Sequence, residues 1–168
     1  MRLSALVAVA CACLLAVVPA SAQDETPQSL FRGVLLKDAK TSSGVKRLLN
    51  TNAGFVSPTP VFADLTGDGK SDAVVTVENG GVAGAIAVYV LTAEGSSSGD
   101  LRVAFRSQSL YQGRVRTSGP TLTVAEPLWS RGDDVCCPRR ASERDYAWDA
   151  AKKAFTRRAT RTVDLNDR

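Results

Sequence analysis

One stretch of the chain spaces oxygen-bearing residues and glycines as a metal loop would. The oxygens recur at every second position: Asp64, Thr66, Asp68, the Lys70 carbonyl and Asp72. Calcium takes six to eight oxygen ligands, and a tight loop supplies them from alternate positions. Gly69 permits the sharp turn that such a loop needs. The spacing predicts a structural calcium site. The alternative is a plain hairpin turn whose carboxylates accept hydrogen bonds from nearby backbone N–H groups.

This loop resembles the calcium loops of FG-GAP and VCBS-type repeats, which carry the pattern D-x-D-G-D-G-x-x-D on a β-hairpin. Thr66 stands at the third position, where that pattern is acidic, so the loop carries less negative charge. Val75 at the twelfth position, in place of Glu, separates the loop from an EF-hand. A single copy falls short of a propeller, so the resemblance implies one calcium-binding hairpin.

The second chemical feature is the adjacent pair Cys136 and Cys137. Adjacent Cα atoms lie about 3.8 Å apart across a trans peptide. This separation is below the usual disulfide range, so a vicinal bridge is strained. Three outcomes stay open: a vicinal disulfide, a bond to another chain, or buried reduced thiols. Dithiol oxidoreductases separate their cysteines by two residues, so the adjacent pair favours a structural role.

The sequence has no histidine. This excludes Ser-His and Cys-His nucleophile pairs, His-ligated zinc and histidine general bases. A carboxylate-based enzyme is a minor alternative resting on Asp133 and Asp134, although neighbouring residues on a strand point to opposite faces. We therefore expect no enzyme, no catalytic residues and no cofactor apart from the calcium considered above.

Basic residues gather near the C-terminal end. Residues 139–161 hold eight Lys and Arg against three acidic residues, and the whole chain carries a net charge of +4. One interpretation is a solvated sheet edge, where basic side chains discourage edge-to-edge pairing. The functional alternative is charge-driven contact with an anionic cell-envelope polymer or with lipid headgroups. No nucleic-acid partner is expected, because aromatic residues do not interleave with the basic ones.

Residues 1–22 have the pattern of a cleavable secretory signal peptide. Arg2 supplies a positive start, residues 3–18 are uncharged and mostly apolar, and an Ala-Ser-Ala motif ends at Ala22. The apolar run is shorter than the ~20 residues that span a bilayer. We expect cleavage after Ala22, no transmembrane segment in the mature chain, and a secreted, extracytoplasmic product.

Three motifs together resemble a group of exported actinobacterial proteins that includes the LppP/LprE-type mycobacterial lipoproteins. They are the Asp-Leu-Thr-Gly-Asp-Gly turn, Gly-Asp-Asp-Val-Cys-Cys-Pro at 132–138 and Tyr-Ala-Trp-Asp at 146–149. The resemblance covers most of residues 45–160 and implies location and architecture, with no particular activity. Cys11 and Cys13 lie inside the apolar run without the Leu-small-small pattern of a lipid-anchor site. We therefore expect no lipid anchor.

Residues 23–50 are expected to form a helical lead-in. Leu30, Phe31, Val34 and Leu35 recur at helical spacing. Thr26 suits the cap and Pro27 the first helical position. A second short helix is expected over residues 43–49.

Residues 51–165 are expected to form a β-rich region of the same domain. Turn signals recur about every ten residues between β-branched and apolar runs. Three hairpins are expected, at 60–65 with 73–78, at 113–117 with 121–125 and at 144–148 with 154–160, and 85–92 is expected to be a central strand. The fold class is therefore α+β: one or two N-terminal helices on a curved, mostly antiparallel meander sheet of about seven or eight strands.

These features together favour a non-enzymatic secreted domain with a binding or structural role at the cell envelope. The first alternative is a calcium-stabilised β domain with no polymer ligand. The second is the carboxylate-based enzyme.

Overall fold

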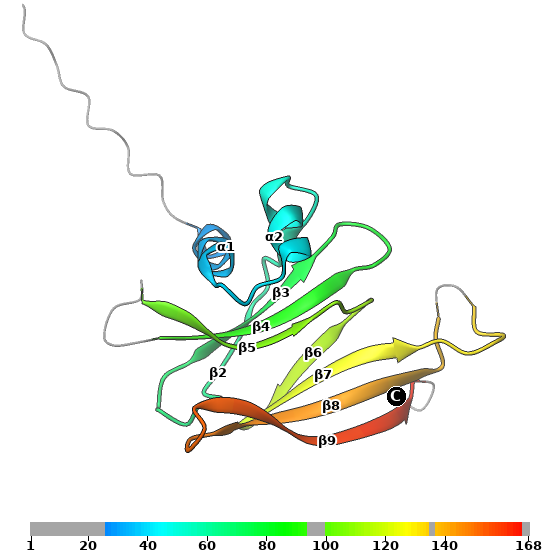
Figure 1. Ribbon diagram of the computed structural model, residues 1–168. Helices are drawn as coiled ribbons and strands as arrows, with labels where there is room; N and C mark the ends of the chain where they lie inside the picture. Colours follow the sequence, from blue (N-terminus) through cyan, green and yellow to red (C-terminus); the bar gives the residue numbers. More distant parts are fainter. Residues whose placement is uncertain (1–25, 94–99, 135–136, 166–168) are drawn as a thin grey trace, which may run out of the picture.

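The computed structural model describes residues 26–93, 100–134 and 137–165, and folds them into two helices followed by nine strands. Figure 1 shows three layers: the helices, a first sheet and a second sheet. The expected signal peptide and its cleavage site at Ala22 lie outside the described residues. Within them, no helix is long and apolar enough to cross a membrane.

Both helices begin at the caps that the sequence provides. Before α1 (Pro27–Lys37), the Thr26 hydroxyl accepts a hydrogen bond from the Ser29 N–H at 3.2 Å. Before α2 (Ser43–Asn50), Ser42 does the same for the Val45 N–H at 3.3 Å. Each helix turns one apolar face onto the first sheet and buries Phe31, Leu35, Val45 and Leu49 there. The sequence predicted one or two N-terminal helices, and the structure has two.

The first sheet holds five antiparallel strands: β1 (Phe55–Val56), β2 (Val61–Ala63), β3 (Asp72–Glu78), β4 (Ala85–Ala93) and β5 (Leu101–Gln108). Its order is β1-β3-β4-β5, and β2 also pairs with β3. The strand β4 lies between two others and is almost wholly buried, which confirms the prediction of a central strand. The β2–β3 hairpin is also as predicted.

The second sheet holds β6 (Arg114–Ser118), β7 (Thr121–Leu128), β8 (Arg140–Asp149) and β9 (Ala154–Asp164), in that order and all antiparallel. The two hairpins predicted here, β6–β7 and β8–β9, are present. Both β6 and β9 are edge strands of this sheet.

The prediction of one curved sheet with seven or eight strands was wrong, because the described chain forms two sheets with nine strands. The break follows β5, where Ser109 and Gln112 adopt positive φ angles of 64° and 50°. The Gly113 N–H then bonds to the Ala85 carbonyl at 2.9 Å, which ties the link to the start of β4. A Cβ on Gly113 would lie 2.8 Å from Leu110 Cδ1 and 3.1 Å from the Ala85 carbonyl oxygen, so a larger residue would require Leu110 and this backbone to shift. The chain therefore starts a new sheet instead of continuing the first.

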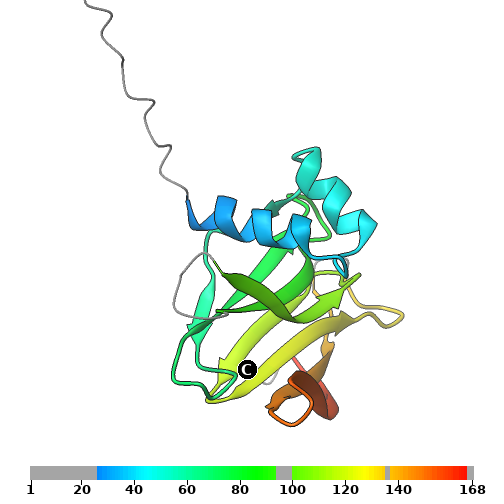
Figure 2. The ribbon, with the colours of Figure 1, turned by 60° about the vertical axis from the view of Figure 1, so that its left-hand side comes forward.

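Two cores follow from this layering. One lies between the helices and the first sheet, and Tyr89, Val75 and Leu91 contribute to it. The other lies between the sheets, where Val88 and Val90 face Leu122 and Val124. A sheet with both faces covered explains the near-continuous apolar sequence of β4. Figures 1 and 2 show the helices and the second sheet on opposite faces of the first sheet, so no helix or sheet of the described residues covers the outer face of the second sheet.

Candidate functional site

A charged network covers the outer face of the second sheet. Leu122 and Val124 face the core between the sheets, so the alternating residues Thr123 and Ala125 face outward. Glu143 on β8 is the cross-strand partner of Ala125 and shares that outward face. Its side chain is nevertheless only 3% exposed. Burial of an ionised carboxylate is unfavourable unless charged or hydrogen-bonding groups replace the water around it.

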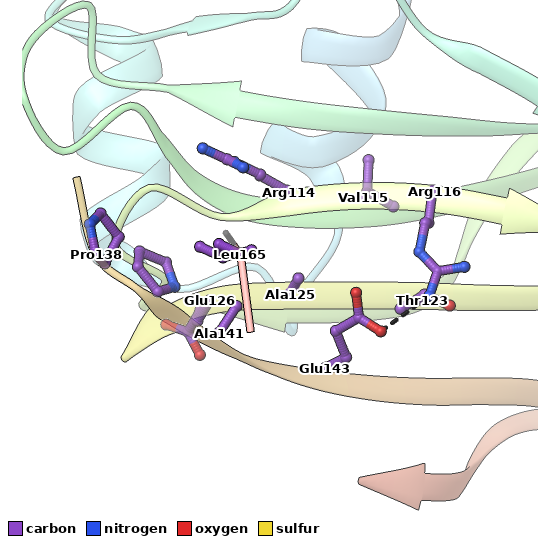
Figure 3. Close-up of a pocket in the computed structure, with 11 residues that line it drawn as sticks. Arg114, Val115, Arg116, Thr123, Ala125, Glu126, Pro138, Ala141, Glu143 and Leu165 are labelled. Carbon is purple, nitrogen blue, oxygen red and sulfur yellow. Dashed lines mark hydrogen bonds and ion pairs between the residues drawn. The ribbon is translucent and has the colours of Figure 1, made fainter. Parts of the chain in front are cut away.

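Glu143 finds those partners on both sides. Arg116 reaches from β6 across β7 and donates to Glu143 Oε2 at 2.9 Å (Figure 3). Arg161 on β9 donates to the same oxygen and to the Asp145 carboxylate. The Thr123 hydroxyl donates to Asp145 Oδ1 at 2.7 Å. These bonds join all four strands of the second sheet across one face.

Contacts within the network shift the pKa values of Asp145 and Arg161. Hydrogen bonds from Arg161 and then from Thr123 hold the pKa of Asp145 below its usual value. The same contacts, with Asp145 first and Glu143 second, raise the pKa of Arg161. A carboxylate with a lowered pKa is a weak base near neutral pH. The arrangement therefore suits electrostatic binding or cross-strand support better than proton transfer.

The basic segment 139–161 divides into paired and unpaired side chains. Arg139 pairs with Asp133, Arg144 with Glu126, Lys152 with Asp149, and Arg161 with Glu143 and Asp145. Arg140 donates to the Ser130 hydroxyl at 2.8 Å. The other three, Lys153, Arg157 and Arg158, are exposed, and none has an ion pair with another residue in the ranges that the structure covers. We call these three the β9 basic surface.

The acidic turn lies between β2 and β3 as predicted. The Asp64 carboxylate accepts hydrogen bonds from the N–H groups of Gly67 at 2.7 Å, Asp68 at 3.2 Å and Gly69 at 3.0 Å. Gly67 and Gly69 have φ angles of 74° and 80°. Residues with side chains rarely adopt this left-handed conformation, so the two glycines allow the loop to wrap around Asp64.

Asp72 closes the other end of this turn. It is 1% exposed, and its Oδ2 accepts the Leu65 and Thr66 N–H groups, both at 2.9 Å. Asp68 accepts the Lys70 N–H at 2.9 Å. Backbone donors thus already occupy the three predicted carboxylate ligands. No cluster of three or more His, Cys, Asp or Glu suited to a metal ion occurs in the part of the chain that is described. These hydrogen bonds are the ones that the plain-turn interpretation predicts, and calcium binding by the loop stays a prediction.

The segment with the cysteines is described only in part. Cys137 is disulfide-bonded, but Cys136 lies outside the described residues, and so does the predicted vicinal bridge. Before it, Asp133 accepts the Ser130 N–H at 2.8 Å and pairs with Arg139. Asp134 forms a β-bridge with Cys137. Asp133, one of the two carboxylates on which the enzyme alternative rests, therefore stabilises its own loop.

The sequence interpretation missed the Glu143 network and a pocket of about 200 Å³ beside it. The available signal was alternation: β6 carries Arg114 and Arg116 two residues apart, and β8 carries Glu143 and Asp145 at the same spacing. Such spacing puts each pair on one face. Pairing them needs the register through β7, which the sequence does not show. Comparisons of the chain with protein-family models, with curated proteins and with solved structures found no match.

Proposed function

We propose that this protein is a secreted, non-enzymatic domain that binds an anionic polymer of the cell envelope through the β9 basic surface. One observation carries the proposal. Lys153, Arg157 and Arg158 are exposed without an ion pair among the described residues, whereas the other basic side chains of their segment are paired or hydrogen-bonded. Exposed cations that no internal carboxylate neutralises attract anionic ligands.

The placement of these cations favours a linear polymer over lipid headgroups. Lys153 belongs to the turn that joins β8 to β9, and Arg157 and Arg158 lie in the edge strand itself. Neighbouring residues of a strand point to opposite faces, so Arg157 and Arg158 flank the β9 edge on its two sides, and Lys153 lies at the turn end of the same edge. Membrane surfaces are usually bound by basic residues together with inserted apolar ones. The exposed large apolar residues of the described chain all lie outside β9: Phe55, Val61, Phe62, Val82, Tyr111, Leu128 and Trp129.

Two further features support a location outside the cytoplasm. The first 22 residues have a signal-peptide pattern. Cys137 is disulfide-bonded, and stable disulfides belong to oxidising compartments. An envelope polymer is therefore a partner that this protein would meet.

A salt titration of binding to isolated cell wall tests the proposal. The Debye length falls from about 10 Å at 0.1 M salt to about 3 Å at 1 M, so binding through exposed charges should weaken steeply over that range. Retention that is lost at high salt is the expected result. Retention that does not change with salt, or no retention at low salt, would contradict the proposal.

A further inference from the structure

The outer face of the second sheet contains a pocket whose origin is a difference in side-chain size. Arg114 on β6, Ala125 on β7 and Glu143 on β8 lie opposite one another in register. A methyl group therefore lies between two long charged side chains, and Ala141 on β8 is a second small residue of the lining. The resulting hollow has a volume of about 200 Å³.

One end of this pocket is apolar and the other is charged. Pro127, Pro138 and Leu165 join Ala125 and Ala141 in lining it. In Figure 3, Pro138 and Leu165 stand at one end, and the Arg116–Glu143 pair stands at the other. The Arg114 side chain extends toward the apolar end in this view. A ligand that fits must therefore carry an apolar body as well as a charge.

The charges around the pocket leave one cation over. Glu143 pairs with Arg116 and Arg161, and Asp145 pairs with Arg161. Together with Arg114, these are three arginines against two carboxylates on the outer face. Arg114 is exposed and has neither a hydrogen bond nor an ion pair with any described residue. Its guanidinium is thus the group at this pocket that is free to take an anion.

We propose that the pocket binds a small aliphatic monocarboxylate, with its carboxylate on Arg114 and its apolar body over Ala125 and Ala141. The planar guanidinium matches a carboxylate with two parallel hydrogen bonds. A single surplus positive charge suits a single negative charge. The Glu143 carboxylate in the lining opposes a doubly charged phosphate.

The size of the pocket limits the ligand to a short molecule or to one terminal unit of a longer one. Its volume of about 200 Å³ is smaller than the 300–1,000 Å³ typical of sites for drug-sized ligands. A free short-chain acid and the C-terminal residue of a peptide with a small side chain share the required chemistry. This site goes beyond the proposed polymer binding, because Arg114 does not belong to the β9 basic surface.

An NMR titration of the mature protein tests the assignment. The probes are isobutyrate for the free acid, N-acetyl-alanyl-alanine for the peptide terminus, the C-terminal amide of that peptide, and inorganic phosphate. Saturable shifts at β6 to β8 are expected with one or both carboxylates, and the preferred probe identifies the source. The amide and phosphate should bind at least tenfold more weakly, because each lacks either the charge or the shape that Arg114 and the apolar lining require.

Variants separate this site from nonspecific charge effects. Arg114→Gln should weaken carboxylate binding at least tenfold, and Ala125→Leu should abolish it by filling the pocket. Arg157→Gln removes the same charge from β9 and should leave carboxylate binding unchanged. The proposal is overturned if neither carboxylate binds at millimolar concentration, if the amide or phosphate binds equally well, or if Arg114→Gln binds as the wild type does. Salt-dependent retention on cell wall by Arg114→Gln would show that the polymer-binding proposal stands regardless.

Discussion

Glu143 on β8 and Arg161 on β9 are cross-strand partners whose side chains form an ion pair on the outer face of the second sheet. Arg116 contacts the same Glu143 carboxylate from β6, the edge strand on the other side. A single buried carboxylate on an inner strand therefore holds both edge strands of this sheet. The pocket beside Arg114 lies on this outer face, whereas the β9 basic surface lies along the β8–β9 turn and the edge strand β9.

Replacement of this carboxylate should destabilise the fold. Glu143→Gln keeps the shape and one acceptor oxygen but leaves Arg116 and Arg161 without the charge that they share. We expect a loss of about 1–3 kcal/mol in the free energy of unfolding, measured by urea denaturation. Glu78→Gln is the control, because Glu78 has no ion pair within the described ranges, and it should change stability by less than about 0.5 kcal/mol. Equal effects of the two variants would rule out a special role for Glu143.

Acid should weaken the same network through Asp145. The folded protein holds the pKa of Asp145 below its usual value, because Arg161 and Thr123 donate hydrogen bonds to the ionised carboxylate. A lowered folded-state pKa gives stability that is present above the unfolded-state pKa of about 3.9 and is lost as the pH falls through the folded-state value. Unfolding free energies measured from pH 6 down to pH 2 should decline less steeply below pH 4 in Asp145→Asn. A variant curve parallel to that of the wild type would show that this pairing does not contribute.

The acidic turn should not depend on calcium. Asp64 and Asp72 already accept five backbone N–H bonds between them. We therefore expect the same melting midpoint in millimolar calcium and in excess chelator, both for the wild type and for Asp68→Asn. A ligand that binds only the folded state raises the midpoint. A rise with calcium that disappears in Asp68→Asn would establish the calcium loop that the spacing first predicted.

Intact mass of the exported protein checks the chain's N-terminus and its thiols together. Cleavage after Ala22 predicts a mature chain that begins at Gln23 and carries no lipid. Cys137 is disulfide-bonded, and of the outcomes that the sequence leaves open we expect the vicinal bridge to Cys136. An alkylating reagent should therefore add nothing before reduction and two groups after it, on a monomer in both cases. A disulfide-linked dimer, or alkylation without reductant, would contradict the vicinal bridge.

Local structure was largely predictable here, and the arrangement of the two sheets was not. The cap at Thr26 and the three hairpins follow from residues close together in sequence, where the turn signals and the alternation agree. The corner after β5 depends on positive φ angles at Ser109 and Gln112. Neither Ser nor Gln is a residue type that predicts this conformation. The contact between Arg116 and Glu143 depends on the register of β6, β7 and β8 together. Local patterns carry no such information, so the network and its pocket became visible only in the fold.

A comparison of two charge-matched variants tests most directly whether Lys153, Arg157 and Arg158 bind an anionic envelope polymer, as we propose. One replaces these three residues with Gln. The other replaces Lys37, Lys40 and Arg47, three exposed basic residues of the helical layer, which lies on the far side of the first sheet from β9 (Figure 1). Exposed charge pairs contribute a few tenths to about 1 kcal/mol each, so the β9 variant should bind isolated cell wall about tenfold or more weakly at low salt. The helix variant should bind as the wild type does. Equal losses of cell-wall binding in both variants would show that only the net charge of the protein matters. Full binding by the β9 variant would contradict polymer binding through the β9 basic surface.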